Sequence, residues 1–149
     1  MKTLRRTLLG FALGALVVLA EPGQTPKKNA DNHAVPKYDL AQEVKVKGEV
    51  LEIKEYECPI SGGMGAHIVL QTSEGPVEIH LALASYLSEY GISFTKGDKL
   101  EIIGNKITFH DVPAMLVRKI IKDQSEYAFR DPKGNPLWVP RTTPKPERK

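Results

Sequence analysis

The chain has 149 residues, of which 41% are hydrophobic and 26% are charged, and its formal net charge is +3. Residues 1–20 contain three basic side chains and no acidic one, so the rest of the chain carries 18 of each sign and is neutral. Surfaces that bind nucleic acid need a basic excess to neutralise phosphates, so this balance argues against a nucleic-acid partner. The 129 residues after position 20 are enough for one domain but not for two.

Residues 1–20 have the pattern of a secretory signal peptide. Three basic residues open the segment, and an apolar run of thirteen residues follows and ends at Ala20. A membrane-spanning helix needs about 20 apolar residues, so this run is short for a span. A small residue at the end of the run suits cleavage after Ala20. We therefore expect the protein to be periplasmic or secreted, by general or twin-arginine export. The alternative is an uncleaved membrane anchor.

The two ends of the remaining chain lack the pattern of a folded segment. Residues 21–37 and 141–149 are polar, contain proline and show no apolar period, so we expect a disordered tether and a disordered basic tail. The folded domain is then residues 38–140. Cys58 is the only cysteine, so this domain must fold without an internal disulfide, although export leads to an oxidising compartment.

The first half of the domain predicts three strands. Apolar residues alternate with polar ones over 44–53, where Gly48 predicts a bulge or bend, and the Gly-rich stretch 54–65 predicts a loop. Residues 66–72 and 76–82 are rich in β-forming residues and are joined by a short link containing glycine, which predicts a hairpin.

The second half begins with a short helix. Residues 83–90 place apolar side chains on one helical face, and Gly91 predicts the end of the helix. Two strands, 99–104 and 106–110, are expected on either side of Asn105.

A further strand over 114–122 and a terminal hairpin complete the chain. The hairpin would pair 126–130 with 136–140 around a turn rich in proline and glycine. We expect Phe94, Phe129 and Trp138 to fill the core and close one end of it.

This element order predicts a mainly β fold: a five-stranded OB-type Greek-key barrel with one short helix between strands 3 and 4, followed by a C-terminal hairpin. The alternative is an open α+β sandwich, but closure removes free sheet edges. The segments KGEVLEIKEY, HIVLQTSEGPVEIHLALASYL, KGDKLEIIGNKITFHDVPAMLVRKI and FRDPKGNPLW resemble small exported bacterial OB-fold proteins of largely unassigned function. The resemblance covers roughly residues 44–138. It implies a binding module for small or cationic ligands, or an accessory subunit, rather than an enzyme.

The predicted hairpin brings two histidines together. If Ser73 and Glu74 form its turn, Ile68 faces Ile79 on the core side and His67 faces His80 on the other side. Directly opposed residues have Cβ atoms about 4.5–5.5 Å apart, so two imidazoles could share a metal ion. A slip of one residue would separate them.

Soft and hard ligands near the pair extend this hypothesis. Cys58 and Met64 precede His67 in the chain, and Glu78 could supply an oxygen, so the candidate metal ligands are His67, His80, Cys58, Met64 and Glu78. Two imidazoles with a thiolate or thioether suit copper or zinc. The alternatives are that both histidines make ordinary hydrogen bonds on an exposed face, and that Cys58 is an inert buried thiol.

A ligand face other than the metal site is also possible. In OB folds the loop between strands 1 and 2 borders the usual binding face, so we single out Tyr56, Gly62, Gly63 and Gly65 there.

No motif for catalysis is present. We expect an exported, non-catalytic module that binds a small ligand or a periplasmic protein partner. Metal handling through His67 and His80 is the alternative, and single-strand nucleic-acid binding is disfavoured.

Overall fold

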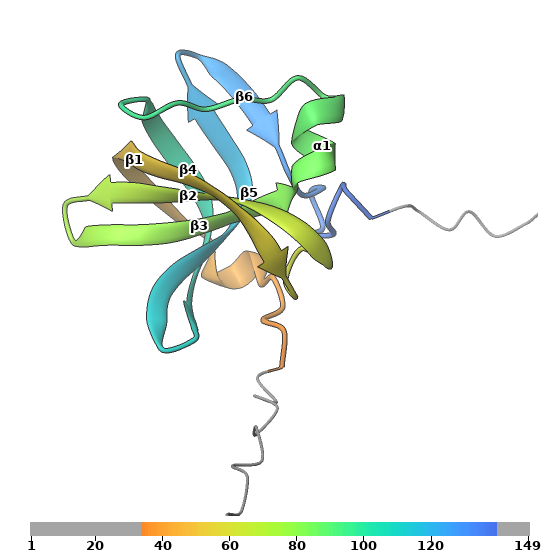
Figure 1. The fold of residues 1–149 in the computed structure, drawn as a ribbon. Helices are drawn as coiled ribbons and strands as arrows, with labels where there is room; N and C mark the ends of the chain where they lie inside the picture. Colours follow the sequence, from red (N-terminus) through yellow and green to blue (C-terminus); the bar gives the residue numbers. More distant parts are fainter. Residues whose placement is uncertain (1–33, 140–149) are drawn as a thin grey trace, which may run out of the picture. The chain divides into compact units, whose positions relative to one another are not determined.

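The computed structural model describes residues 34–139 (Figure 1). The predicted signal peptide, the predicted tail and most of the predicted tether lie outside the described residues. Among the residues that the structure describes, no helix is long and apolar enough to cross a membrane.

The described part of the chain is mainly β. Its elements in chain order are η1 (Leu40–Gln42), β1 (Val44–Cys58), β2 (Gly63–Thr72), β3 (Gly75–Leu83), α1 (Ala84–Glu89), β4 (Lys99–Phe109), β5 (Val112–Lys122) and β6 (Ser125–Ala128). The six strands form one sheet in the order β3-β2-β1-β4-β5-β6, and a parallel pairing of β3 with β5 closes five of them into a ring. The predicted strand number of five was therefore wrong by one, because β6 adds to the outside of β5. The short helix between the third and fourth strands is confirmed.

The hairpin of β2 and β3 forms in the predicted register. Leu70 pairs with Val77, Ile68 with Ile79 and His67 with His80. Thr72 fixes the turn, since its hydroxyl accepts from Glu74 N and donates to Gly75 O. The turn therefore sets the pairing that the rest of the hairpin follows.

The predicted loop over 54–65 was too long. β1 continues to Cys58 and pairs with β2 from Lys54↔His67 to Cys58↔Gly63, so the turn is only residues 59–62. Glycine did not break the strand here because Gly63 and Gly65 lie in extended backbone within β2. The segment thus extends the sheet beside β2, on the side opposite β3, rather than forming a loop.

Gly48 is a point of close approach and not the bulge itself. A Cβ on Gly48 would lie 2.3 Å from the carbonyl oxygen of Gln71. The register between β1 and β2 shifts two residues further on, between Val50 and Glu52.

β4 is one continuous strand where two strands were expected. Asn105 is buried, and its side chain bonds the backbone of Asp39 twice: Oδ1 accepts from Asp39 N at 2.7 Å and Nδ2 donates to Asp39 O at 2.7 Å. An amide pairs with backbone as another strand would, so Asn105 anchors the segment before η1 and forms no turn. The irregularity falls instead at Gly104, where a Cβ would lie 2.1 Å from Leu116 O.

The predicted terminal hairpin is reduced to one isolated bridge, Arg130↔Pro136. Residues 125–128 pair with β5 instead, across a turn in which Asp123 and Gln124 have positive φ. The turn after Arg130 does form, closed by Gly134 N donating to Asp131 O at 2.9 Å. Residues 136–139 still touch the segment before the turn, since Leu137 N donates to Phe129 O at 3.1 Å, but Pro136 has no N–H to continue a ladder.

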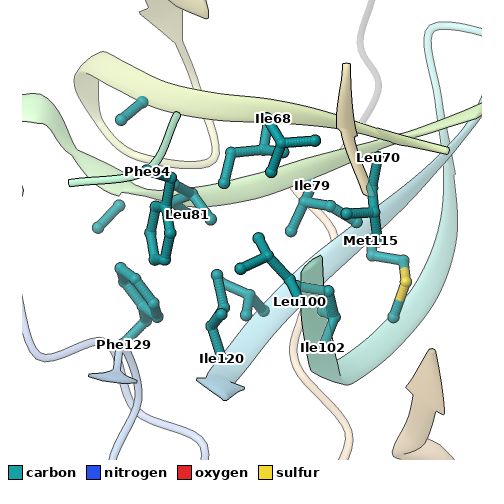
Figure 2. Close-up of a cluster of buried hydrophobic side chains, with 14 of the residues drawn as sticks. Ile68, Leu70, Ile79, Leu81, Phe94, Leu100, Ile102, Met115, Ile120 and Phe129 are labelled. Carbon is teal, nitrogen blue, oxygen red and sulfur yellow. The ribbon is translucent and has the colours of Figure 1, made fainter. Parts of the chain in front are cut away.

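The main core fills the ring. Figure 2 shows side chains from β2, β3, β4 and β5 converging with Phe94 and Phe129. Phe129 is fully buried and Phe94 and Trp138 are 7% and 8% exposed, which confirms that these three aromatic residues belong to the core.

Candidate metal centre

The two histidines of the β2–β3 hairpin lie away from the main core, yet they are buried. His67 is 0% exposed and His80 is 3% exposed. The interpretation that they are polar residues on a solvent-exposed face is therefore wrong. Something must cover this face of the hairpin, and the covering residues come from elements that sequence patterns did not place there.

The second half of β1 provides one cover. Residues two apart in a strand share a face, so Tyr56 and Cys58 both point toward the histidines. The ring of Tyr56 stacks on His67 with centroids 3.9 Å apart and planes 5° apart. On the other side Phe109, the last residue of β4, meets the ring of His80 edge-on at 5.1 Å.

Cys58, His67 and His80 together form a group of three metal-ligating side chains. The Cys58 sulfur lies 3.5 Å from His80 Nδ1, and the two histidine rings are 4.8 Å apart and nearly perpendicular. One donor atom from each residue lies within 4.8 Å of the others. Donors around one ion at Zn–S of about 2.3 Å and Zn–N of about 2.0–2.1 Å would be roughly 3.3–3.8 Å apart. The donors would therefore have to approach one another by up to about 1 Å to close around an ion.

His67 has an unmet requirement for a polar partner. Both of its ring nitrogens are buried and neither makes a hydrogen bond of normal geometry within the described residues, although the backbone of Lys54 and Gly65 approaches the ring closely enough to raise its pKa. A buried polar group without a partner costs about 1–3 kcal/mol. Such groups are rare in native proteins, and a bound ion or water is one of the explanations for them.

The electrostatics of the site keep both imidazoles neutral. Burial lowers the pKa of His67, and burial together with the neighbouring His67 lowers the pKa of His80 to about 4. The nearby Glu78 opposes both shifts, and the backbone of Gly65 and Lys54 also opposes the shift at His67, without cancelling them. At neutral pH the ring nitrogens are therefore free of the extra proton that would prevent metal binding.

The remaining candidate ligands fall outside this group. The hydroxyl of Tyr56 donates to the Glu78 carboxylate, which is half-buried beside the histidines. Met64 is 46% exposed, and alternation along β2 places it on the opposite face from His67. In the sequence, Met64 was assigned to a predicted loop, and side chains alternate between two faces only in a strand.

The glycines of the expected ligand face have separate roles. Gly62 has φ +79° in the turn and open space around it, and a Cβ on Gly63 would meet only the tip of Leu83. Gly65 is different: a Cβ there would lie 2.4 Å from Ser61 Oγ, 2.8 Å from His67 Cε1 and 3.1 Å from Cys58 Cβ. The missing side chain at Gly65 is what lets Cys58 and His67 approach each other.

Sequence reasoning missed the two aromatic covers. Tyr56 was assigned to a ligand face in a predicted loop and Phe109 fell within the predicted strand 106–110, and neither was connected to the histidines. The signal that could have found Tyr56 is its spacing of two from Cys58, once β1 is recognised to continue through both.

The sequence model of the MamS/MamX magnetosome protein family matches residues 42–127. The chain belongs to this family. The match to the MamS/MamX magnetosome family spans all five strands of the ring and includes Cys58, His67 and His80. A search of curated proteins found no match. The MamS/MamX finding replaces the broader resemblance to exported OB-fold proteins as the family assignment.

Proposed function

We propose that this chain is an exported, non-catalytic module on an OB-type barrel, and that it binds one copper or zinc ion through Cys58, His67 and His80. The observation that carries the proposal is the buried group of three donors within 4.8 Å, one of which, His67, has two ring nitrogens without partners.

The strand connectivity supports the OB-type assignment. The ring runs β3-β2-β1-β4-β5 and returns to β3 through a parallel pairing, and α1 lies between β3 and β4. A five-stranded, partly open Greek-key barrel of this kind can carry an added edge strand such as β6. A fold of this type hosts many functions, so the metal-binding function is argued from the site.

The donor set favours a soft or borderline transition metal. A thiolate with two imidazoles suits copper or zinc, whereas Mg²⁺ and Ca²⁺ prefer oxygen ligands. The three donors come from three strands of the ring, so the scaffold holds them rather than a loop.

The predicted export and the family assignment bear on where the protein works. Residues 1–20 have the pattern of a signal peptide, and the family is described as one of magnetosome proteins. We infer that the module works outside the cytoplasm, in the periplasm or as a secreted protein, and that it passes metal to or from a protein partner.

Binding of a small ligand elsewhere is the second candidate. An open cavity of about 600 Å³ lies beside the first half of β1 and is lined by Lys47, Gln71, Lys99, Glu101 and Ile121 among others. Lys47 is already 3.5 Å from Glu101 in an ion pair, and among the described residues the unpartnered buried side-chain atoms belong to His67 alone. The observations therefore favour the metal site over the open cavity as the functional site.

The test is a titration of the purified chain with Cu(I), under anaerobic conditions, and with Zn(II). We expect one ion per chain at a site that Cys58→Ser and His67→Phe each weaken by at least about tenfold. Met64→Leu is the matched control, because Met64 is a soft ligand outside the group. Equal binding by the chain and by the Cys58→Ser/His67→Phe double variant would rule the site out.

A further inference from the structure

We infer that Tyr56 makes this site selective for monovalent copper, by holding the carboxylate of Glu78 away from the ion. The inference rests on the proposed metal site and deepens it, because it names the ion and the residue that selects it.

The net charge of the buried site differs between Cu(I) and Zn(II). A coordinating thiol loses its proton, so Cys58 contributes one negative charge, and the two neutral imidazoles contribute none. With Cu(I) the buried centre is neutral. With Zn(II) it carries a net positive charge, and an uncompensated buried charge is costly.

The second step is the number of donors. The group contains three ligating side chains, and stacked and edge-on rings of Tyr56 and Phe109 lie against its histidines. Structural zinc sites have four ligands, and three-ligand zinc sites keep an open position for water. Three soft or borderline donors between aromatic rings match Cu(I) better than Zn(II).

The third step is the position of Glu78. Alternation along β3 places Glu78 on the same face as His80 and two residues from it, and it bonds Tyr56, whose ring is stacked on His67, so it lies near both histidines. It would give Zn(II) both the fourth ligand and the balancing charge. The hydroxyl of Tyr56 donates to this carboxylate, while the ring of Tyr56 lies flat on His67. One side chain thus covers the site and restrains the ligand that zinc needs.

The experiment compares the chain with Tyr56→Phe, which keeps the ring on His67 and removes only the hydroxyl. Cu(I) affinity is measured anaerobically by competition with a chromogenic Cu(I) chelator, and Zn(II) affinity by competition with a fluorescent zinc indicator. Tyr86→Phe is the matched control, because it also loses one phenol hydrogen bond, to Ala128 O, away from the site.

We expect Tyr56→Phe to tighten Zn(II) binding by about tenfold and to leave Cu(I) binding within a few-fold of the original. Adding Glu78→Gln to Tyr56→Phe should remove the gain, and Tyr86→Phe should change neither metal. Unchanged or weaker Zn(II) binding by Tyr56→Phe overturns the inference, as does a gain that survives Glu78→Gln. Both outcomes leave metal binding by Cys58, His67 and His80 intact, whereas a chain that binds neither metal there overturns the proposed function itself.

Discussion

His67 is a polar ring in a place where an apolar ring would fit. It is fully buried, it stacks on Tyr56, and neither of its nitrogens makes a hydrogen bond of normal geometry among the described residues. Placing such a group in the interior lowers the stability of the metal-free protein. A site kept at the expense of stability is expected where a residue serves binding rather than folding.

Replacing His67 with phenylalanine should separate these two effects. The substitution His67→Phe keeps the stacking on Tyr56 and removes both unpartnered nitrogens, so the free energy of unfolding without metal should rise by about 1 kcal/mol. Urea denaturation in the presence of a chelator measures this change. The same variant should lose metal affinity. A variant that is destabilised by more than 1 kcal/mol would show that the His67 nitrogens have partners within the folded protein.

His80 predicts a dependence of stability on pH. Its pKa in the folded state is about 4, below the ordinary 6.5, so between these values the unfolded chain binds a proton that the folded chain does not. The metal-free protein should therefore be most stable above pH 6.5 and lose about 1 kcal/mol between pH 7.5 and pH 5.5 as pH falls. His67 shifts in the same direction.

Urea midpoints at the two pH values, with a chelator present, measure this loss. His80→Asn is the control, since it removes one of the two histidines that titrate and should reduce the dependence of stability on pH. A metal-free protein whose stability stays constant or rises as the pH is lowered would contradict the burial of neutral histidines.

At the scale of elements, β2 shows how a glycine can serve a site without making a turn. A Cβ on Gly65 would crowd Ser61, Cys58 and His67, whereas a Cβ on Gly63, in the same strand and on the same face, would meet only the tip of Leu83 at 3.2 Å. The two positions therefore form a matched pair.

Gly65→Ala should cost about 1–3 kcal/mol of stability and weaken metal binding by at least about tenfold, because Cys58 and His67 must move apart. Gly63→Ala should change both much less. Thermal unfolding and the Cu(I) competition assay measure the two effects. If the two variants behave alike, the crowding at Gly65 does not control the site.

The same strands show what the sequence could and could not predict. The register of β2 and β3 followed from alternation and from a short turn, so the pairing of His67 with His80 was predictable. The length of β1 was not predictable, because the glycine and charged residues in 54–65 are typical of a loop, whereas the backbone there continues to pair with β2. The burial of the histidines depends on that extension, which brings Tyr56 and Cys58 over them.

At the scale of the whole molecule, ring closure makes two cores from one sheet. Side chains on the inner face of the strands fill the ring. Outside this main core, a smaller buried cluster contains Cys58, His67, His80 and Phe109. Local sequence patterns do not predict this ring closure, because β3 and β5 pair in parallel although they are separated by more than 30 residues in the sequence. The neutral charge of the chain after residue 20 lacks the basic excess that a polyanion-binding surface needs.

X-ray absorption at the copper edge, recorded on the chain loaded anaerobically with one equivalent of Cu(I), tests the central claim most directly. The site predicts one sulfur and two imidazole nitrogens around the metal, with the sulfur lost in Cys58→Ser and unchanged in Met64→Leu. A shell of nitrogen and oxygen alone in the unaltered chain, or a sulfur that persists in Cys58→Ser, would contradict a copper site built from Cys58, His67 and His80.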